Sequence, residues 1–166
     1  MLKTWPERPQ DVSNLLNPAF LGLLIYRAVG GFKREKNTGM PFELAVLVFP
    51  LVLHGATRVR LPKSITTSLP TWLQEHRDAL VEFGRRTRAL VPYAREAIEF
   101  MLERKVLTFD GEGRLDVGNG TIRGVTKYQQ TTEEIEDCYK RAEFVGRWLA
   151  LAGNSATIYV LFGIRP

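Results

Sequence analysis

The stretch from residue 92 to residue 117 constrains the fold more than any other, because a helix-forming segment runs directly into two short β-forming runs. Pro92 begins a segment whose apolar residues recur at helical spacing. The runs Val106–Phe109 and Arg114–Val117 follow it, separated by Asp110-Gly111-Glu112-Gly113, which is typical of a tight turn. The sequence therefore predicts a helix followed at once by a β-hairpin.

This order of elements is the closing half of a winged helix, a module that usually reads nucleic acid. The helix that would do the reading has a formal charge of −1, from Arg95, Arg104, Glu96, Glu99 and Glu103. A helix that lies among phosphates is more often cationic. We therefore expect a winged helix used mainly for protein docking, with Glu96 and Glu99 on a face open to solvent or to a partner.

Two apolar helices are predicted before this module. Asn17-Pro18 is typical of a helix start, and Gly30-Gly31 is expected to end that helix. The second helix is expected to run from Pro41 to about Gly55, with a kink or an early end at Pro50. Both segments are apolar nearly all round, which predicts burial on more than one face and leaves apolar surface for a partner.

The remaining elements are also expected to be helical. A short helix is predicted from Ser68, a longer one over about 78–90, and these two complete the helix count of a winged helix with the one from Pro92. Thr131-Thr132-Glu133-Glu134 has the form of a capping box and predicts a helix to about residue 152. The last segment, Ala156–Phe162, could be helix or strand, and its flanking Ser155 and Gly163 favour helix.

The predicted fold class is thus mainly α with a small β-hairpin, and its organisation has three parts. Residues 1–57 form an N-terminal arm and the apolar helical pair, residues 58–118 the winged-helix core, and residues 119–166 a loop, the long C-terminal helix and the terminal segment. The chain has 166 residues, of which 45% are hydrophobic and 25% charged, which suits one globular unit with its own core.

Several classes of function are disfavoured by what the sequence lacks. There is no phosphate-binding GxxxxGK[ST] loop, and one cysteine with two histidines does not make a zinc site. No catalytic, cofactor-binding or metal-binding residues are therefore expected. Cys138 alone excludes a disulfide framework within the chain and suits a reducing cytoplasm. The most apolar run, Leu44–Leu53, is shorter than the roughly 20 residues of a membrane span, so no membrane contact is expected.

The middle of the chain is its basic part, since residues 58–105 hold ten Lys and Arg against six Asp and Glu. On a helix, Arg85 and Arg88 share a face and Arg86 flanks it. The candidate nucleic-acid contacts are Arg58, Arg60, Lys63, Arg85, Arg86 and Arg88. The alternative is an ordinary solvated face with no phosphate contact.

Gly146-Arg147-Trp148 is a second candidate site. Glycine permits close approach of another backbone, and an arginine beside aromatic residues needs an ionic partner if it is buried. Arg147 and Trp148 are therefore expected to form a packing and ion-pair motif, either within the fold or at a partner interface.

An ordered set of short strings resembles a family of bacterial proteins. The strings are Asn17-Pro18-Ala19-Phe20, Phe49–His54, Thr66–Leu73, Arg88–Pro92, Gly146-Arg147-Trp148, Ala156-Thr157-Ile158 and Gly163–Pro166. In this order they resemble the middle component of three-component ABC systems, which include Lamassu-type antiphage defence. The resemblance implies a small non-catalytic subunit with a winged-helix region, encoded between an SMC-like ABC ATPase and another component, often an effector such as a nuclease.

The sequence and the resemblance together predict an adaptor subunit that bridges or regulates the SMC-like ABC ATPase and the effector. The alternative from a different class is a winged-helix DNA-binding regulator, which the basic middle segment favours. A combination is also open, in which the complex closes on DNA and this subunit supplies a few phosphate contacts.

Overall fold

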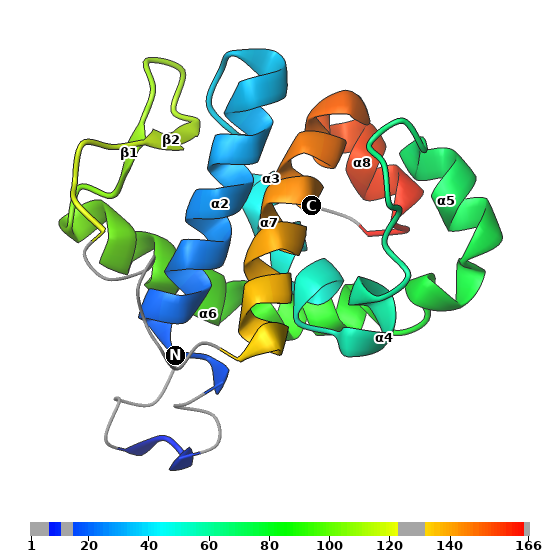
Figure 1. Ribbon diagram of the computed structural model, residues 1–166, viewed down its shortest axis with the longest axis horizontal. Coiled ribbons are helices and arrows are strands. Elements are labelled where there is room, and N and C mark those ends of the chain that lie inside the picture. The colour runs from blue at the N-terminus through cyan, green and yellow to red at the C-terminus, as the bar shows by residue number, and fades with distance from the viewer. Residues whose placement is uncertain (1–6, 11–14, 123–131, 165–166) are drawn as a thin grey trace.

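The computed structural model describes residues 7–10, 15–122 and 132–164 (Figure 1). Its longer helices are α2 (Pro18–Lys36), α3 (Phe42–Val52), α6 (Phe83–Glu103) and α7 (Glu133–Leu151). The shorter helical elements are α4 (Gly55–Arg58), α5 (Leu69–Glu75), the 3₁₀ turn η2 (Arg77–Leu80) and α8 (Ser155–Leu161). Strands β1 (Leu107–Phe109) and β2 (Leu115–Val117) form an antiparallel hairpin. The predicted class, mainly α with a small β-hairpin, is confirmed.

Helices α2 and α7 lie side by side at the centre of the molecule, and α6 crosses behind their lower ends (Figure 1). The hairpin is at one end of the molecule, and α5 and α8 are at the other (Figure 1). Helix α3 packs between these layers, and every residue from Leu44 to Val52 is buried. Because α3 has no exposed apolar face, its all-round apolar sequence serves the protein's own core.

This burial corrects one expectation about the N-terminal helical pair. Both helices were expected to leave apolar surface for a partner, but their apolar residues contribute to one hydrophobic cluster shared with α6 and α7. Large apolar side chains that stay exposed among the described residues are scattered: Leu15, Val59, Val81, Phe109, Leu151 and Val160. Single exposed apolar residues of this kind are normal on a folded protein.

The prediction that Gly30-Gly31 ends the first helix is wrong. Helix α2 continues to Lys36 and ends at Asn37, whose φ of 56° is left-handed and whose amide bonds to the Lys33 carbonyl at 2.8 Å. Gly31 is needed for packing, because a Cβ there would overlap the backbone carbonyl of Glu143 in α7. The glycine pair therefore marks a close helix contact and not a helix end.

The two helices predicted on either side of residue 91 are one continuous helix, α6. Pro92 removes one main-chain hydrogen bond, but it lies on the exposed face, where water can satisfy the Arg88 carbonyl. The helix begins at Phe83 and not at residue 78, because Glu82 adopts a left-handed conformation with φ 60°. Pro50 likewise stays inside α3, which ends two residues later.

The other predicted starts and ends hold with small shifts. Asn17 and Ser68 cap α2 and α5 with their side chains. Thr132 caps α7 by accepting from the Ile135 amide, whereas Thr131 lies outside the described residues. The terminal segment is a helix, as favoured, but Asn154 caps it in place of Ser155. The segment between α3 and α5 begins with the short helix α4.

The hairpin has the predicted turn and an additional connection to the first half of the chain. Met40, between α2 and α3, forms a β-bridge with Leu115, with N···O distances of 2.8 and 2.9 Å. The order α2, Met40, α3, α6, β1, β2 is compatible with a winged helix, which stays a prediction. The elements in this order come from both 18–52 and 58–118, and the hydrophobic core that they share also includes residues of 119–166.

Candidate functional site

Arg58, a candidate nucleic-acid contact, is buried within the fold. Its side chain is only 8% exposed, and its guanidinium bonds to Glu134 at 2.8 Å and to Asp137 at 2.9 Å on α7. It also donates to the Val52 carbonyl at 2.8 Å. A buried arginine with these three partners fastens α4 to α7, and its burial keeps it from the exposed surface that a phosphate contact needs.

The other cations of the predicted cluster do not form one site. Arg60 is ion-paired with Asp78, and Lys63 is exposed in the turn region before α5. Arg86 donates to the carbonyls of Val81 at 2.9 Å and Ala79 at 3.2 Å, so it holds the turn before α6.

Burial, and secondly the positive charge of Arg86, lower the pKa of His54. Arg85 and Arg88 remain exposed on α6, although Arg85 forms a surface ion pair with Glu82.

Arg147 and Trp148 make their contacts within the fold. Trp148 is 1% exposed and donates its indole N–H to the Thr67 carbonyl at 2.6 Å. The Arg147 Nε lies 2.6 Å from Glu35 Oε1 on α2. The adjacent Gly146 is in contact with α2, because a Cβ there would overlap the Ala28 carbonyl. Of the two alternatives for this motif, the structure supports the one inside the subunit.

Glu96 and Glu99 differ in their surroundings. Glu96 forms a two-point ion pair with Arg8, at 2.7 and 2.8 Å, which fastens the N-terminal segment to α6. Glu99 is exposed. The pair therefore does not act as a unit, and only Glu99 belongs to the open face of α6.

The open face of α6 carries a stripe of exposed residues that the sequence analysis did not identify as one feature. The α6 stripe consists of Arg85, Arg88, Pro92, Arg95, Glu99 and Glu103. Their spacing of three or four residues places them on one side of the helix. The first half of the stripe is basic and the second half acidic. The signal was present in the sequence, but the assumed break at Pro92 divided it between two helices.

This order of charges opposes the dipole of α6. A helix is stabilised by acidic side chains near its N-terminus and basic ones near its C-terminus. Helix α7 follows that order, with Glu133, Glu134 and Glu136 in its first turn, and α2 has three cations in its last turn. Helix α6 has no acidic residue in its first turn and no basic residue in its last. The order of charges in the α6 stripe therefore destabilises α6 through the helix dipole.

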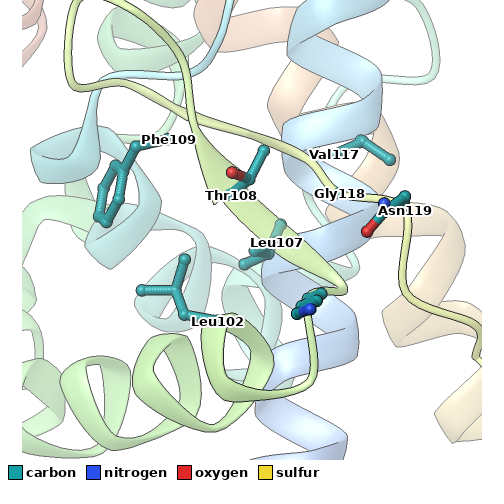
Figure 2. Close-up of a pocket in the computed structure, with 8 residues that line it drawn as sticks. Leu102, Leu107, Thr108, Phe109, Val117, Gly118 and Asn119 are labelled. Carbon is teal, nitrogen blue, oxygen red and sulfur yellow. The ribbon is translucent and has the colours of Figure 1, made fainter.

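An open groove lies between the C-terminal end of α6 and the hairpin (Figure 2). Its volume is about 640 Å³, and its apolar lining comes from Leu102, Leu107, Phe109 and Val117. Phe109 and Leu102 lie on the same side of β1 in Figure 2. Phe109 is 46% exposed, so the groove is accessible from solvent. The remaining lining residues are Lys105, Thr108, Gly118 and Asn119.

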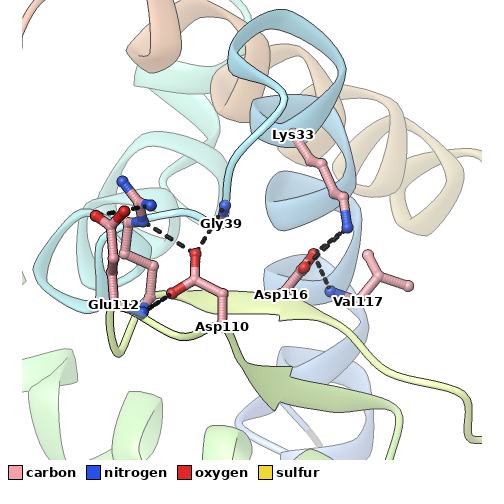
Figure 3. Close-up of polar contacts among 7 residues, drawn as sticks. Lys33, Gly39, Asp110, Glu112, Asp116 and Val117 are labelled. Carbon is pink, nitrogen blue, oxygen red and sulfur yellow. Dashed lines mark hydrogen bonds and ion pairs between the residues drawn. The ribbon is translucent and has the colours of Figure 1, made fainter.

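Two aspartates hold the hairpin against the first half of the chain (Figure 3). Asp116 accepts from Lys33 Nζ on α2 at 2.8 Å and from the Val117 amide at 2.7 Å. Asp110 accepts from the Gly39 amide at 3.3 Å and from the Arg114 amide at 2.9 Å. Hydrogen bonds from the Arg114 backbone and side chain, with one from the Glu112 backbone, lower the pKa of Asp110 from 3.8 to about 2.

The described part of the chain offers little for metal chemistry or membrane insertion. Within residues 7–10, 15–122 and 132–164, no group of three or more His, Cys, Asp or Glu side chains could hold a metal ion. Among the same residues, no helix combines the length and the apolar character that a membrane span needs. Cys138 is buried, and burial raises the pKa of its thiol.

Comparison with known proteins identifies the family. The family model described as ABC-three component (ABC-3C) system Middle Component 3 matches residues 5–166. No curated protein and no solved structure matches the chain. A middle component has an accessory role in a multi-component ABC system and works with the other components. Because the match covers nearly the whole sequence, this chain belongs to the Middle Component 3 family of ABC-three component systems.

Proposed function

We propose that this chain is a non-catalytic adaptor that bridges or regulates an SMC-like ABC ATPase and an effector in a bacterial antiphage defence complex of Lamassu type. The observation that carries the proposal is the family match over residues 5–166. The effector is a nuclease or another toxic activity. The subunit contributes binding surfaces, and the chemistry belongs to its partners.

Docking on the ATPase would use surfaces other than α2 and α3, because the apolar residues of these helices lie in the core. The surfaces left are the α6 stripe, the groove beside the hairpin and the scattered exposed apolar residues. Interfaces of this kind combine a few apolar anchors with a polar rim.

Co-purification tests the adaptor function. When the tagged chain is expressed with the products of its neighbouring genes, a stable complex with a long coiled-coil ATPase is expected. Elution of the chain alone in the presence of those proteins contradicts the proposal. The docking surface can be located with single aspartate substitutions of exposed apolar residues, which leave the core intact: Leu15, Val59, Val81, Phe109, Leu151 and Val160.

In this set each variant is the matched control for the others. Loss of the ATPase in one or two variants, with retention in the rest, places the interface at those residues. Retention in all six shifts docking to charged surface. The non-catalytic role is tested separately by assaying the purified chain for nucleotide hydrolysis and nuclease activity. Turnover by the purified chain in the absence of its partners contradicts the non-catalytic role.

A winged-helix DNA-binding regulator is the second candidate, and the exposed Arg85, Arg88 and Arg95 on α6 favour it. If these three contact phosphates, DNA affinity should fall roughly fortyfold between about 50 and 200 mM salt, from a slope near −0.9 per contact. Replacement of Arg85 and Arg88 by alanine should then flatten the slope. The matched control is the Lys36→Ala/Lys140→Ala pair, which removes the same charge from exposed sites on α2 and α7. An unchanged slope excludes phosphate contacts by Arg85 and Arg88.

A further inference from the structure

The α6 stripe carries opposite charges at its two ends, in an order that opposes the helix dipole. Arg85 and Arg88 lie near one end and Glu99 and Glu103 near the other, all on one exposed side of the helix. A stripe that is basic at one end and acidic at the other is complementary to its own copy turned end for end. Two-fold dimers have this property, since the same patch meets itself in the opposite direction.

We propose that two copies of this chain associate through antiparallel packing of their α6 helices. With the two-fold axis at the level of Tyr93 and Ala94, Arg85 lies opposite Glu103 of the second copy and Arg88 lies opposite Glu99. Symmetry repeats both pairs, so four ion pairs form along the contact. Charges that destabilise α6 within one subunit thereby become favourable between two.

The middle of the stripe allows the two helices to approach. Ala89 and Pro92 are exposed there and have short side chains. Helix axes come within about 8–10 Å only when the contacting residues are small enough. Arg95 lies opposite Pro92 of the second copy, where its long side chain can extend to the edge of the contact. Its closeness to its own symmetry mate makes it the one unfavourable charge in this arrangement.

The area of the charged stripe is too small to form a stable dimer interface by itself. A helix of 21 residues is roughly 31 Å long and about 10 Å wide, which gives a strip of about 300 Å². A standard interface buries about 800 Å² on each partner. The ends of α6 supply further apolar surface: Val81, 63% exposed, precedes the helix, and the groove of Leu102 and Phe109 follows it.

The antiparallel arrangement brings these two ends together. Val81 of one copy lies at the level of the hairpin groove of the other, and the reverse contact follows by symmetry. Val81 and the groove are thus complementary in the antiparallel dimer, as the basic and acidic ends of the stripe are. The occupant of the groove is therefore the segment at Val81, just before α6, in the second copy.

Charge exchange between variants tests this dimer with the purified full-length chain. Sedimentation velocity should show a dimer that dissociates as salt is raised from about 50 to 500 mM, because exposed ion pairs are screened. Arg85→Glu/Arg88→Glu makes both ends of the stripe acidic, and Glu99→Arg/Glu103→Arg makes both ends basic. Each variant alone should raise the dimer Kd by at least about tenfold through like-charge repulsion.

Mixing the two variants gives the decisive result. A stripe with two acidic ends and a stripe with two basic ends should form a one-to-one heterodimer, and the chain with all four substitutions should dimerise again. Lys36→Glu/Lys140→Glu changes the net charge equally at exposed sites outside the contact and should leave the dimer unchanged. Val81→Asp should weaken the dimer, whereas Arg95→Ala should not.

Three outcomes would overturn the inference. The first is a wild-type chain that stays monomeric at low salt, and the second is failure of the acidic and basic variants to associate. The third is a monomeric chain whose stripe variants release the ABC ATPase in co-purification, which would assign this face to that partner. The dimer does not depend on the adaptor function, because the isolated chain suffices for its test.

Discussion

Trp148 joins α7 to the segment around α5 through a ring contact and a hydrogen bond. Its ring meets Trp72 edge-on at a centroid distance of 5.4 Å and lies 6.0 Å from the ring of Phe144. Its indole N–H is bonded to the Thr67 carbonyl. Because the side chain is almost fully buried, both its apolar area and this hydrogen bond contribute to stability.

Replacement of Trp148 by alanine should lower the free energy of unfolding by roughly 3–5 kcal/mol, as expected for a large buried aromatic residue. Urea denaturation followed by circular dichroism measures the change. Trp148→Phe is the matched control, since it keeps a buried aromatic ring while losing the N–H donor and part of the ring area, and its effect should be clearly smaller. A loss below about 1 kcal/mol for the alanine variant would mean that Trp148 is not buried in the isolated subunit.

Asp110 makes the hairpin sensitive to acid. Its pKa of about 2 in the folded chain is below its ordinary value of 3.8. A carboxyl group with a lowered folded pKa binds fewer protons in the folded state than in the unfolded state. Its stabilisation is therefore complete above about pH 4 and is lost as the pH falls towards 2.

Thermal unfolding between pH 5 and pH 2 should reveal this contribution. The wild-type Tm should fall more steeply below about pH 4 than the Tm of Asp110→Asn, which has no charge to lose. Glu136→Gln is the control, because this exposed carboxylate on α7 has no comparable set of hydrogen bonds to it among the described residues. Parallel curves for wild type and Asp110→Asn would show that Asp110 does not hold the turn.

At the scale of elements, the contact between α2 and α7 is set by two glycines. Gly31 on α2 and Gly146 on α7 each lie against the backbone of the other helix. Without a Cβ at these positions, the helices approach more closely than ordinary side chains permit. This contact positions Arg147 for its ion pair with Glu35, so the candidate motif depends on the glycine beside it.

The adjacent residues Gly30 and Gly31 provide a matched pair of variants. Gly31→Ala should lower the free energy of unfolding by roughly 1–3 kcal/mol, because its Cβ would overlap the Glu143 carbonyl. Gly30→Ala should raise it by about 0.5–1 kcal/mol, since a Cβ there has nothing within 4 Å and glycine weakens a helix. Equal effects of the two substitutions would contradict the close α2–α7 contact.

Helix ends were predictable where a local hydrogen bond sets them. The side chains of Asn17 and Ser68 accept from amides in their own first turns, so the residues that decide these starts are adjacent in sequence. Gly31 and Pro92 were misinterpreted because their effect depends on distant structure. Gly31 stays inside a helix because α7 packs closely against it, and Pro92 stays inside a helix because it lies on the solvent-exposed face.

At the scale of the whole molecule, one hydrophobic core connects all three predicted parts of the sequence. The cluster includes residues of α2 and α3, of α6 and the hairpin, and of α7 and α8. Polar contacts cross the same divisions, since Tyr159 on α8 donates to the Glu43 carbonyl at 2.8 Å and Lys33 pairs with Asp116. Parts that share a core are expected to unfold together.

A single cooperative transition is therefore expected on chemical denaturation. Tryptophan fluorescence, which reports on Trp5, on Trp72 in α5 and on Trp148 in α7, should coincide with far-ultraviolet circular dichroism, which reports on all helices. The midpoints should agree within error and should shift together in Gly31→Ala. Separate transitions would show that the predicted parts fold as independent units.

The sequence by itself determined the mainly helical class, the position of the hairpin, the capped helix starts and, through its ordered strings, the family. These depend on local hydrogen bonding and on patterns of adjacent residues. Only the tertiary structure decided that Arg58 is buried between α4 and α7, that the apolar helices face inward and that the α6 stripe is continuous. These features depend on which surfaces pack together in the fold. The sequence alone does not decide them, because a charged or apolar residue reads the same whether its side chain faces solvent or another helix.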